Sequence, residues 1–402
     1  MINLKPKNNQ KNKIFLVRIN AKRFSRIKYF FGHENSLNFR WKRLVFALFL
    51  ILLILTYGCK GKKSTEKSLE EIRTGTEGIA LSFLPNAPPT TIHIEQGAPI
   101  EANAFDVVLE IRNKGAYPQP NEGTGGLGPS FGKVFLSGYD PTIITLESKD
   151  GKSGDLSKLA LEGKSTINPN GGQDILGFNG KILAENLNVE KYEPTLLATA
   201  CYYYFTIAGP SVCIDPNPYS TVKEKKVCEV QDTSLSSQGA PIAVTRIDEE
   251  AFATKTQFRI TIKNAGNGDV LKADAASNKC DPSGTQKITR EDVDKVNLMW
   301  VKIADKALMC GPFAEAPQKN TGGLIRLING EGFVICELPS SEYSNKISAY
   351  TTPLLIQLSY GYRNSIEKKI QIKKEVSGFA SGESTPTSPI IEDRDIGGFG
   401  TP

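Results

Sequence analysis

Leu109-Glu-Ile-Arg-Asn-Lys-Gly115 recurs later in the chain as Ile260-Thr-Ile-Lys-Asn-Ala-Gly266. Each copy carries apolar residues at every second position and ends in Asn-x-Gly, the pattern of a strand followed by a reversal. A second pair of matching stretches follows in the same order, 196–204 (LLATACYYY) and 354–362 (LLIQLSYGY). The offsets are 151 and 158 residues, so the sequence predicts a duplicated unit.

The duplication predicts two domains, at residues 75–219 and 240–376, joined by a connector at 220–239. We expect a mainly β fold of two tandem Ig-like antiparallel β-sandwiches, because 36 Gly and 23 Pro separate many short apolar runs. The candidate strands are Gly78–Leu84, Phe105–Ile111, Lys133–Leu136, Ile143–Leu146, Ile242–Ile247, Phe258–Ile262, Val296–Ile303, Leu324–Ile328 and Gly332–Leu338.

Paired tyrosines lie at period two in the second pair of matching stretches, Tyr202 with Tyr204 in the first copy and Tyr360 with Tyr362 in the second. Alternate residues of a strand share one face of its sheet. We expect these rings to pack in the core, and a face on which a ligand stacks is the alternative.

Four short motifs carry a resemblance to a known family: Arg112-Asn-Lys-Gly115, Lys263-Asn-Ala-Gly266, Leu136-Ser-Gly-Tyr-Asp-Pro141 and Asn329-Gly-Glu-Gly-Phe333. With them the chain resembles CARDB-type and related immunoglobulin-like domains of uncharacterised exported prokaryotic, often archaeal, surface proteins. The resemblance covers most of residues 75–376. It implies display or adhesion at the cell surface and carries over no functional residue.

The N-terminal region indicates where the protein works. Residues 1–43 carry twelve Lys or Arg and one acid, and the apolar segment 44–58 follows directly. The tail is thus +11 while the whole chain is +6, which leaves −5 for the remainder. This asymmetry follows the positive-inside rule, so we expect a cytoplasmic tail or extended signal n-region, a membrane partner and no nucleic-acid partner. Residues after 59 are then extracytoplasmic.

Two readings of the apolar segment stay open. As a helix it would span about 22 Å, short of the roughly 30 Å hydrocarbon core, which suits a signal peptide. Cys59 is then a lipid-attachment candidate, although Thr56 and Tyr57 depart from the lipoprotein pattern before it. Otherwise the segment is a retained transmembrane helix. Residues 59–74 are expected to be a linker and 377–402 a disordered tail.

Six further cysteines all follow the apolar segment, and an even number in an exported domain predicts disulfides. Cys201 and Cys213 flank an expected hairpin, and Cys310 and Cys336 flank neighbouring strands, so we pair each couple. Cys228 and Cys280 remain and form the third expected bond.

Catalytic patterns are absent from the sequence, and no cofactor or metal is expected. The chain has two histidines, and His93 lies near no Gly-x-Ser-x-Gly elbow. The glycine-rich stretch 123–128 follows prolines in place of a strand, so it predicts a loop. The polar stretches 168–174 and 264–269 match no full calcium loop, and the pair Asp292 and Asp294 is typical of a solvated turn.

The function that we expect from the sequence is non-catalytic. A membrane-anchored extracytoplasmic Ig-like protein would serve cell-surface structure or adhesion, with other surface or envelope proteins or glycans as partners. The alternative is a surface receptor subunit that binds a peptide or glycan ligand.

Overall fold

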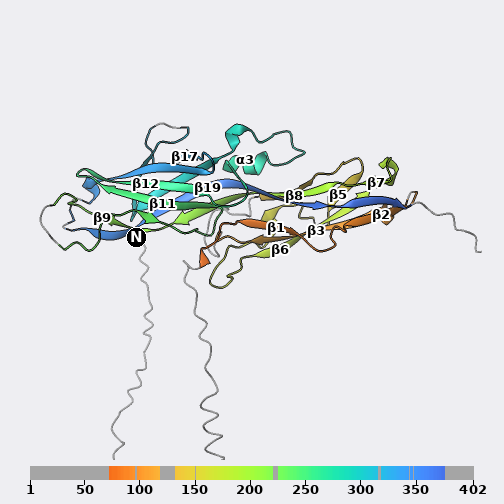
Figure 1. Ribbon diagram of the computed structural model, residues 1–402, viewed down its shortest axis with the longest axis horizontal. Coiled ribbons are helices and arrows are strands. Elements are labelled where there is room, and N and C mark those ends of the chain that lie inside the picture. Colours follow the sequence, from red (N-terminus) through yellow and green to blue (C-terminus); the bar gives the residue numbers. More distant parts are fainter. Residues whose placement is uncertain are drawn as a thin grey trace, which may run out of the picture. The chain divides into compact units, whose positions relative to one another are not determined.

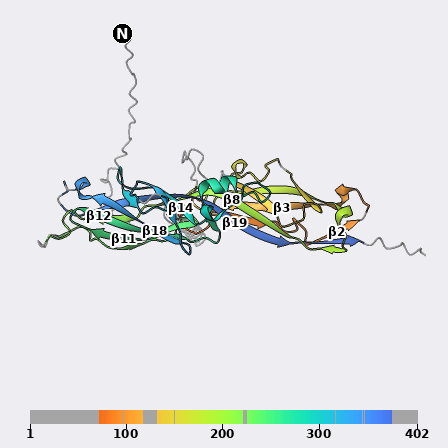
Figure 2. The same cartoon turned by 90° about the horizontal axis from the view of Figure 1, so that it is seen from above.

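The computed structural model describes residues 72–95, 97–117, 132–149, 151–220, 225–315, 318–343, 345–346 and 348–375. The described part is mainly β, as predicted (Figures 1 and 2). The N-terminal tail, the apolar segment, Cys59, the stretch 123–128 and the C-terminal tail at 377–402 lie outside the described residues.

The strands follow one another in the order β1 (Ile79–Phe83), β2 (Thr91–Glu95), β3 (Ala104–Asn113), β4 (Gly132–Ser137), β5 (Ile144–Ser148), β6 (Gln173–Ile182), β7 (Lys191–Tyr192), β8 (Thr195–Ala208), β9 (Ser211–Ile214), β10 (Thr233–Ser234), β11 (Ile242–Ala251), β12 (Lys255–Asn264), β13 (Asp269–Leu271), β14 (Lys295–Ile303), β15 (Lys306–Ala307), β16 (Met309–Gly311), β17 (Gly323–Arg326), β18 (Glu331–Pro339), β19 (Tyr350–Lys369) and β20 (Gln371–Glu375). The described helices are short: α3 (Ala273–Asn278) and the 3-10 turns Ile100–Asn103, Leu156–Lys158, Ala184–Asn186, Arg290–Asp292 and Ser340–Glu342.

Two similar sheets reflect the repeat. One has the order β1-β3-β6-β5 and the other β10-β11-β12-β18-β16. An eight-stranded sheet joins both halves along the path β15-β14-β19-β8-β4, and a small sheet has the order β2-β20-β7. Inward residues such as Phe258, Ile260 and Ile262 of β12 are fully buried, while Arg259 and Lys263, at alternate positions of the strand, are exposed. Burying each such apolar side chain stabilises the fold by about 1.5–3 kcal/mol.

The seam between the halves is the antiparallel pair β8 and β19, which lie side by side in both views (Figures 1 and 2). Tyr202 is opposite Tyr362 and Tyr204 is opposite Tyr360, so the register is symmetric about the pair Tyr203 and Gly361. Since the repeat offset here is 158, the two copies meet through equivalent strands. The duplicated segments therefore share a sheet as well as a connector.

The repeated Asn-x-Gly turn binds a repeated tyrosine hydroxyl. In the second half, the Tyr362 hydroxyl accepts a hydrogen bond from the backbone N–H of Gly268 at 2.7 Å and donates to Asn264 Oδ1 at 3.2 Å. The Asn264 amide in turn donates to the Gly268 carbonyl at 2.9 Å. A Cβ at Gly266 would collide with the hydroxyl, so the turn needs glycine there.

The first half repeats this network at the matching positions. The Tyr204 hydroxyl accepts from the backbone N–H of Tyr117 at 3.2 Å and donates to Asn113 Oδ1 at 3.1 Å. The Asn113 amide donates to the Tyr117 carbonyl at 2.8 Å. In each half, the Asn-x-Gly stretch and the tyrosine stretch therefore form one hydrogen-bonded unit, and this unit occurs twice in the chain.

The other two tyrosines hold the first residues of β1 and β11. The Tyr202 hydroxyl accepts from the N–H of Ile79, and the Tyr360 hydroxyl accepts from the N–H of Ile242, which is the matching position. The four rings contact one another with centroids 5.8–6.4 Å apart. All four are at most 3% exposed, which confirms core packing in place of a ligand-stacking face.

The cysteines form three disulfides, but two pairings differ from expectation. Cys310 bonds Cys336 as the sequence suggested, whereas Cys201 bonds Cys280 and Cys213 bonds Cys228. The expected pairs Cys201 with Cys213 and Cys228 with Cys280 are wrong. The reason is that β8 continues through Ala208 without a hairpin at Cys201, and an extended strand separates cysteines beyond the 4.4–6.8 Å that a disulfide allows.

Removing one seam hydroxyl tests the repeated network. We expect Tyr362→Phe to lower the free energy of unfolding by about 1–3 kcal/mol, because the Gly268 N–H and the Asn264 oxygen lose their buried partner. The matched control is Tyr203→Phe, whose hydroxyl has no hydrogen bond within the described part. Urea unfolding measures both variants, and equal losses would contradict the role of the hydroxyl.

The disulfides should differ in their effect on stability. Cys201 and Cys280 are 79 residues apart, so replacing both by Ser should cost about 4–5 kcal/mol from loop-closure entropy. Replacing Cys213 and Cys228, which are 15 residues apart, should cost about 3 kcal/mol. Urea unfolding of the two double variants gives the order, and a larger loss for the shorter loop would overturn it.

Candidate functional site

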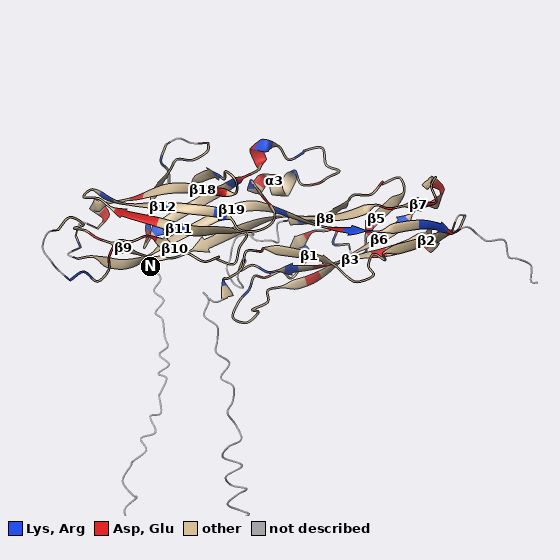
Figure 3. Cartoon of the chain, viewed as in Figure 1, with Lys and Arg blue, Asp and Glu red and all other residues tan. Residues whose placement is uncertain are grey.

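A depression of about 410 Å³ lies on the outer face of β11, β12 and β18. The period of two on these strands turns acidic, basic and amide side chains outward, while the residues between them enter the core. Figure 3 shows acidic and basic segments next to each other on β11. The lining residues are Asp232, Arg246, Asp248, Glu250, Gln257, Arg259 and Ile335.

Ion pairs order one side of the depression. Arg246 contacts both Asp248, two residues along β11, and Asp232 at 2.6 Å. These charges satisfy one another, and at such exposure each pair contributes little stability. Their effect is to hold three side chains in place along this rim.

Arg259 lines the depression from β12, the strand between β11 and β18. Its guanidinium carbon lies 4.0 Å from the ring centroid of Phe333, which is 42% exposed. Its cross-strand neighbour on β11 is Asp248, but that carboxylate contacts Arg246. In the described part of the chain no carboxylate lies within ion-pairing distance of Arg259, so its charge is available to a ligand.

The first half has no such arrangement at the same positions. The repeat offsets of 151 and 158 place Val108 where the second half has Arg259, and Ile175 where it has Phe333. The two outer faces therefore differ in chemistry although their strands pair alike. This site was not predicted from the sequence. The signal that could have revealed it is that Arg259 and Phe333 in the second half stand where the first half has Val108 and Ile175.

A buried carboxylate lies on the opposite face of β11. Glu249 is 6% exposed; Oε2 accepts a hydrogen bond from the backbone N–H of Cys213 at 3.2 Å, and Oε1 has no partner. Burial raises the pKa of Glu249 to about 7, and the single hydrogen bond offsets this only in part. It faces the core, so it does not line the depression.

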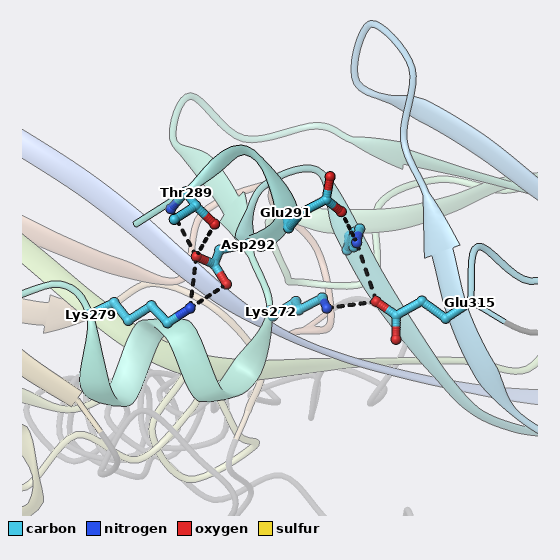
Figure 4. A network of polar contacts seen from close by, with 7 residues as sticks. Lys272, Lys279, Thr289, Glu291, Asp292 and Glu315 are labelled. Carbon is cyan, nitrogen blue, oxygen red and sulfur yellow. Dashed lines mark hydrogen bonds and ion pairs between the residues drawn. The ribbon is translucent and has the colours of Figure 1, made fainter. Parts of the chain in front are cut away.

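Figure 4 shows a second polar cluster, near α3. Lys279 binds both oxygens of Asp292 at 2.8 and 3.0 Å, and Thr289 donates to the same carboxylate. Burial alone would raise the pKa of Asp292, but the bonds from Lys279 and Thr289 outweigh it and lower the pKa to about 2. The group is therefore a permanently charged structural contact.

Buried Lys295 completes this cluster. It reaches Glu291 at 3.0 Å and Glu315 at 3.3 Å, and Glu315 also contacts Lys272 at 2.6 Å (Figure 4). Each charge has an opposite neighbour, so the cluster ties the segment before β14 to the loop after β16. Asp294, the other acid considered from the sequence, adopts a positive φ of 56° in the adjoining turn.

The remaining candidates do not converge. His93 is exposed and lies 3.4 Å from Glu375. Asp174 accepts from two backbone N–H groups and from Lys152, so its oxygens are engaged within the protein. Asp269 pairs with Arg363. Among the described residues, no three His, Cys, Asp or Glu side chains gather in a way that could hold a metal ion.

Among the residues that the structure describes, no helix is long and apolar enough to cross a membrane. The segment 44–58 lies outside that range, so its role stays a prediction.

Comparisons with known proteins identify no relative. No protein-family model matches the chain, and no curated protein matches it. Among solved structures, the collagen binding domain of Erysipelothrix rhusiopathiae surface protein RspB aligns at 10% identity over 74% of this chain and 97% of that one, with a TM-score of 0.11. So low a score carries no argument, and the likeness to CARDB-type domains stays a prediction.

The pH dependence of stability tests the buried state of Glu249. The pKa of Glu249 is about 7 in the folded protein and about 4.3 in the unfolded chain. The folded protein therefore keeps this proton up to a higher pH than the unfolded chain does. Wild-type stability should therefore fall as the pH rises from about 4 to 7, by about 3–4 kcal/mol in all. Glu249→Gln should lack this drop, as unfolding at pH 5 and pH 8 would measure.

The control for this measurement is Glu250→Gln, which removes a neighbouring carboxylate from the exposed face of the same strand. It should keep the wild-type slope between pH 5 and pH 8. If Glu249→Gln keeps that slope as well, the carboxylate is solvated and the assignment is wrong.

Proposed function

We propose that this chain is a membrane-anchored extracytoplasmic protein of two tandem Ig-like β-sandwiches that serves cell-surface structure or adhesion. It acts by binding and not by catalysis. Its N-terminal tail stays on the cytoplasmic side or is removed with a signal peptide, and the disulfide-bonded region lies outside the membrane.

The observation that carries the proposal is the set of three disulfides in the β-rich region. Disulfides persist in oxidising, extracytoplasmic compartments and are rare in the cytosol. The distribution of charge supports the same direction of insertion, because the basic tail precedes the apolar segment and the rest is net negative.

The arrangement of strands suits a surface role. Fourteen residues of β8 pair with β19, and the bond between Cys201 and Cys280 adds a covalent link beside this seam. Such a core resists opening, while the outer faces of the two halves remain free to bind. The charged depression on β11, β12 and β18 favours the second candidate, a surface receptor subunit that binds a peptide or glycan.

Labelling of intact cells tests the location. A membrane-impermeant maleimide should modify Cys201, Cys213 and the other four distal cysteines only after reduction, and an impermeant amine reagent should reach lysines within residues 72–375. Lysines of residues 1–43 should be either protected or missing from the mature protein. Peptide mass spectrometry reads both, and six free thiols inside unlabelled cells would refute the proposal.

A further inference from the structure

We infer that the depression on β11, β12 and β18 binds a saccharide that carries a carboxylate, of the uronic-acid class, with Arg259 as the group that binds the carboxylate. The inference rests on the proposed function, since it names the ligand that such a surface protein would hold. No relative or motif assigns this site.

Arg259 is suited to a carboxylate ligand. Its guanidinium carbon lies 4.0 Å from the ring centroid of Phe333, and this contact restricts the side chain. A guanidinium presents a fork of N–H donors that matches a carboxylate with two parallel hydrogen bonds. Because Asp248 is engaged by Arg246, the fork is open to a partner from outside.

Acceptors for hydroxyl groups lie beside Arg259. Glu250 and Gln257 are directly opposite each other on β11 and β12, and neither side chain has a hydrogen-bond or ion-pair partner among the described residues. Carboxylate and amide groups of this kind accept hydrogen bonds from adjacent hydroxyls. Ile335, opposite Arg259 on β18, supplies an apolar patch for the C–H face of a sugar ring.

The geometry disfavours an extended peptide. β12 lies between β11 and β18 and pairs with both, so its backbone groups are already used. Peptides that add to a sheet need a free edge, whereas this surface offers side chains alone. The three acids of the lining also disfavour a simple polyanion, because Glu250 would repel a second negative charge close to the first.

The site should be single in each chain. Val108 and Ile175 occupy the matching positions of the first half, and neither can bind a carboxylate. The volume of about 410 Å³ lies in the range of small-ligand sites, so we expect a short oligosaccharide segment to fill it.

Isothermal titration of the oxidised full-length chain tests the inference. The probes are trisaccharides with one galacturonate, mannuronate or guluronate residue between two neutral hexoses. Each probe carries a single carboxylate, and the three differ in hydroxyl stereochemistry. At least one should bind with one site per chain, and its methyl ester should bind at least ten times more weakly. Arg259→Gln should weaken binding of the acid 10–100-fold, and Phe333→Leu about 3–10-fold.

The matched control is Lys263→Gln, which removes one positive charge from the same strand and the same exposed face, outside the depression. It should leave the affinity unchanged, and all variants should keep the wild-type unfolding midpoint. Loss of binding in this control as in Arg259→Gln would show general attraction of anions and overturn the site.

Two further outcomes would also overturn the inference. One is the absence of Arg259-dependent binding to all three trisaccharides that carry a single uronate. The other is equally tight binding of triglutamate, since the site would then recognise a carboxylate on any scaffold. Neither outcome affects the proposed location, because cell-surface labelling of the oxidised protein is a separate measurement.

Discussion

The pairing of β8 with β19 brings four tyrosines together at the seam, and much of the structure depends on how their hydroxyls are used. Each hydroxyl binds backbone of a different element: Tyr204 and Tyr362 hold the Asn-x-Gly turns, and Tyr202 and Tyr360 hold the first residues of β1 and β11. A buried hydroxyl without such a partner would be costly. The requirement for partners thus fixes where the second sheet of each half lies.

This constraint acts only on the inner faces. The inward positions of the two halves are similar because each must satisfy the same hydroxyls and fill the same core. The outward positions carry no such requirement, and they have diverged: Val108 and Ile175 in the first half correspond to Arg259 and Phe333 in the second. The two halves thus keep similar cores while their outer faces differ in chemistry.

Asymmetry also appears at the seam itself. Tyr203 lies opposite Gly361, and α3 of the second half packs where a side chain at Gly361 would meet Ala276. The bond from Cys201 to Cys280 fastens the segment after α3 to β8. Covalent and packing contacts therefore reinforce one side of a junction whose hydrogen bonds are nearly symmetric.

The sequence by itself determined the β class, the two repeated motifs and the strand faces. These follow from local rules, because side chains alternate along a strand and Asn-x-Gly allows a tight reversal. The bounds of β1, β4, β12 and β18 accordingly lie within a few residues of those expected. The burial of the four tyrosines follows from the same period of two.

Only the tertiary structure decided which distant elements meet. The alternation of side chains along β12 predicts that Arg259 points outward. It does not predict that Phe333 and Asp248 flank Arg259 on the neighbouring strands. The partner of Cys201 likewise depends on β8 running straight past the expected hairpin and on α3 crossing the seam. The physical reason is that pairing between strands is set by the sum of many long-range contacts, whereas sequence patterns record the needs of one strand at a time.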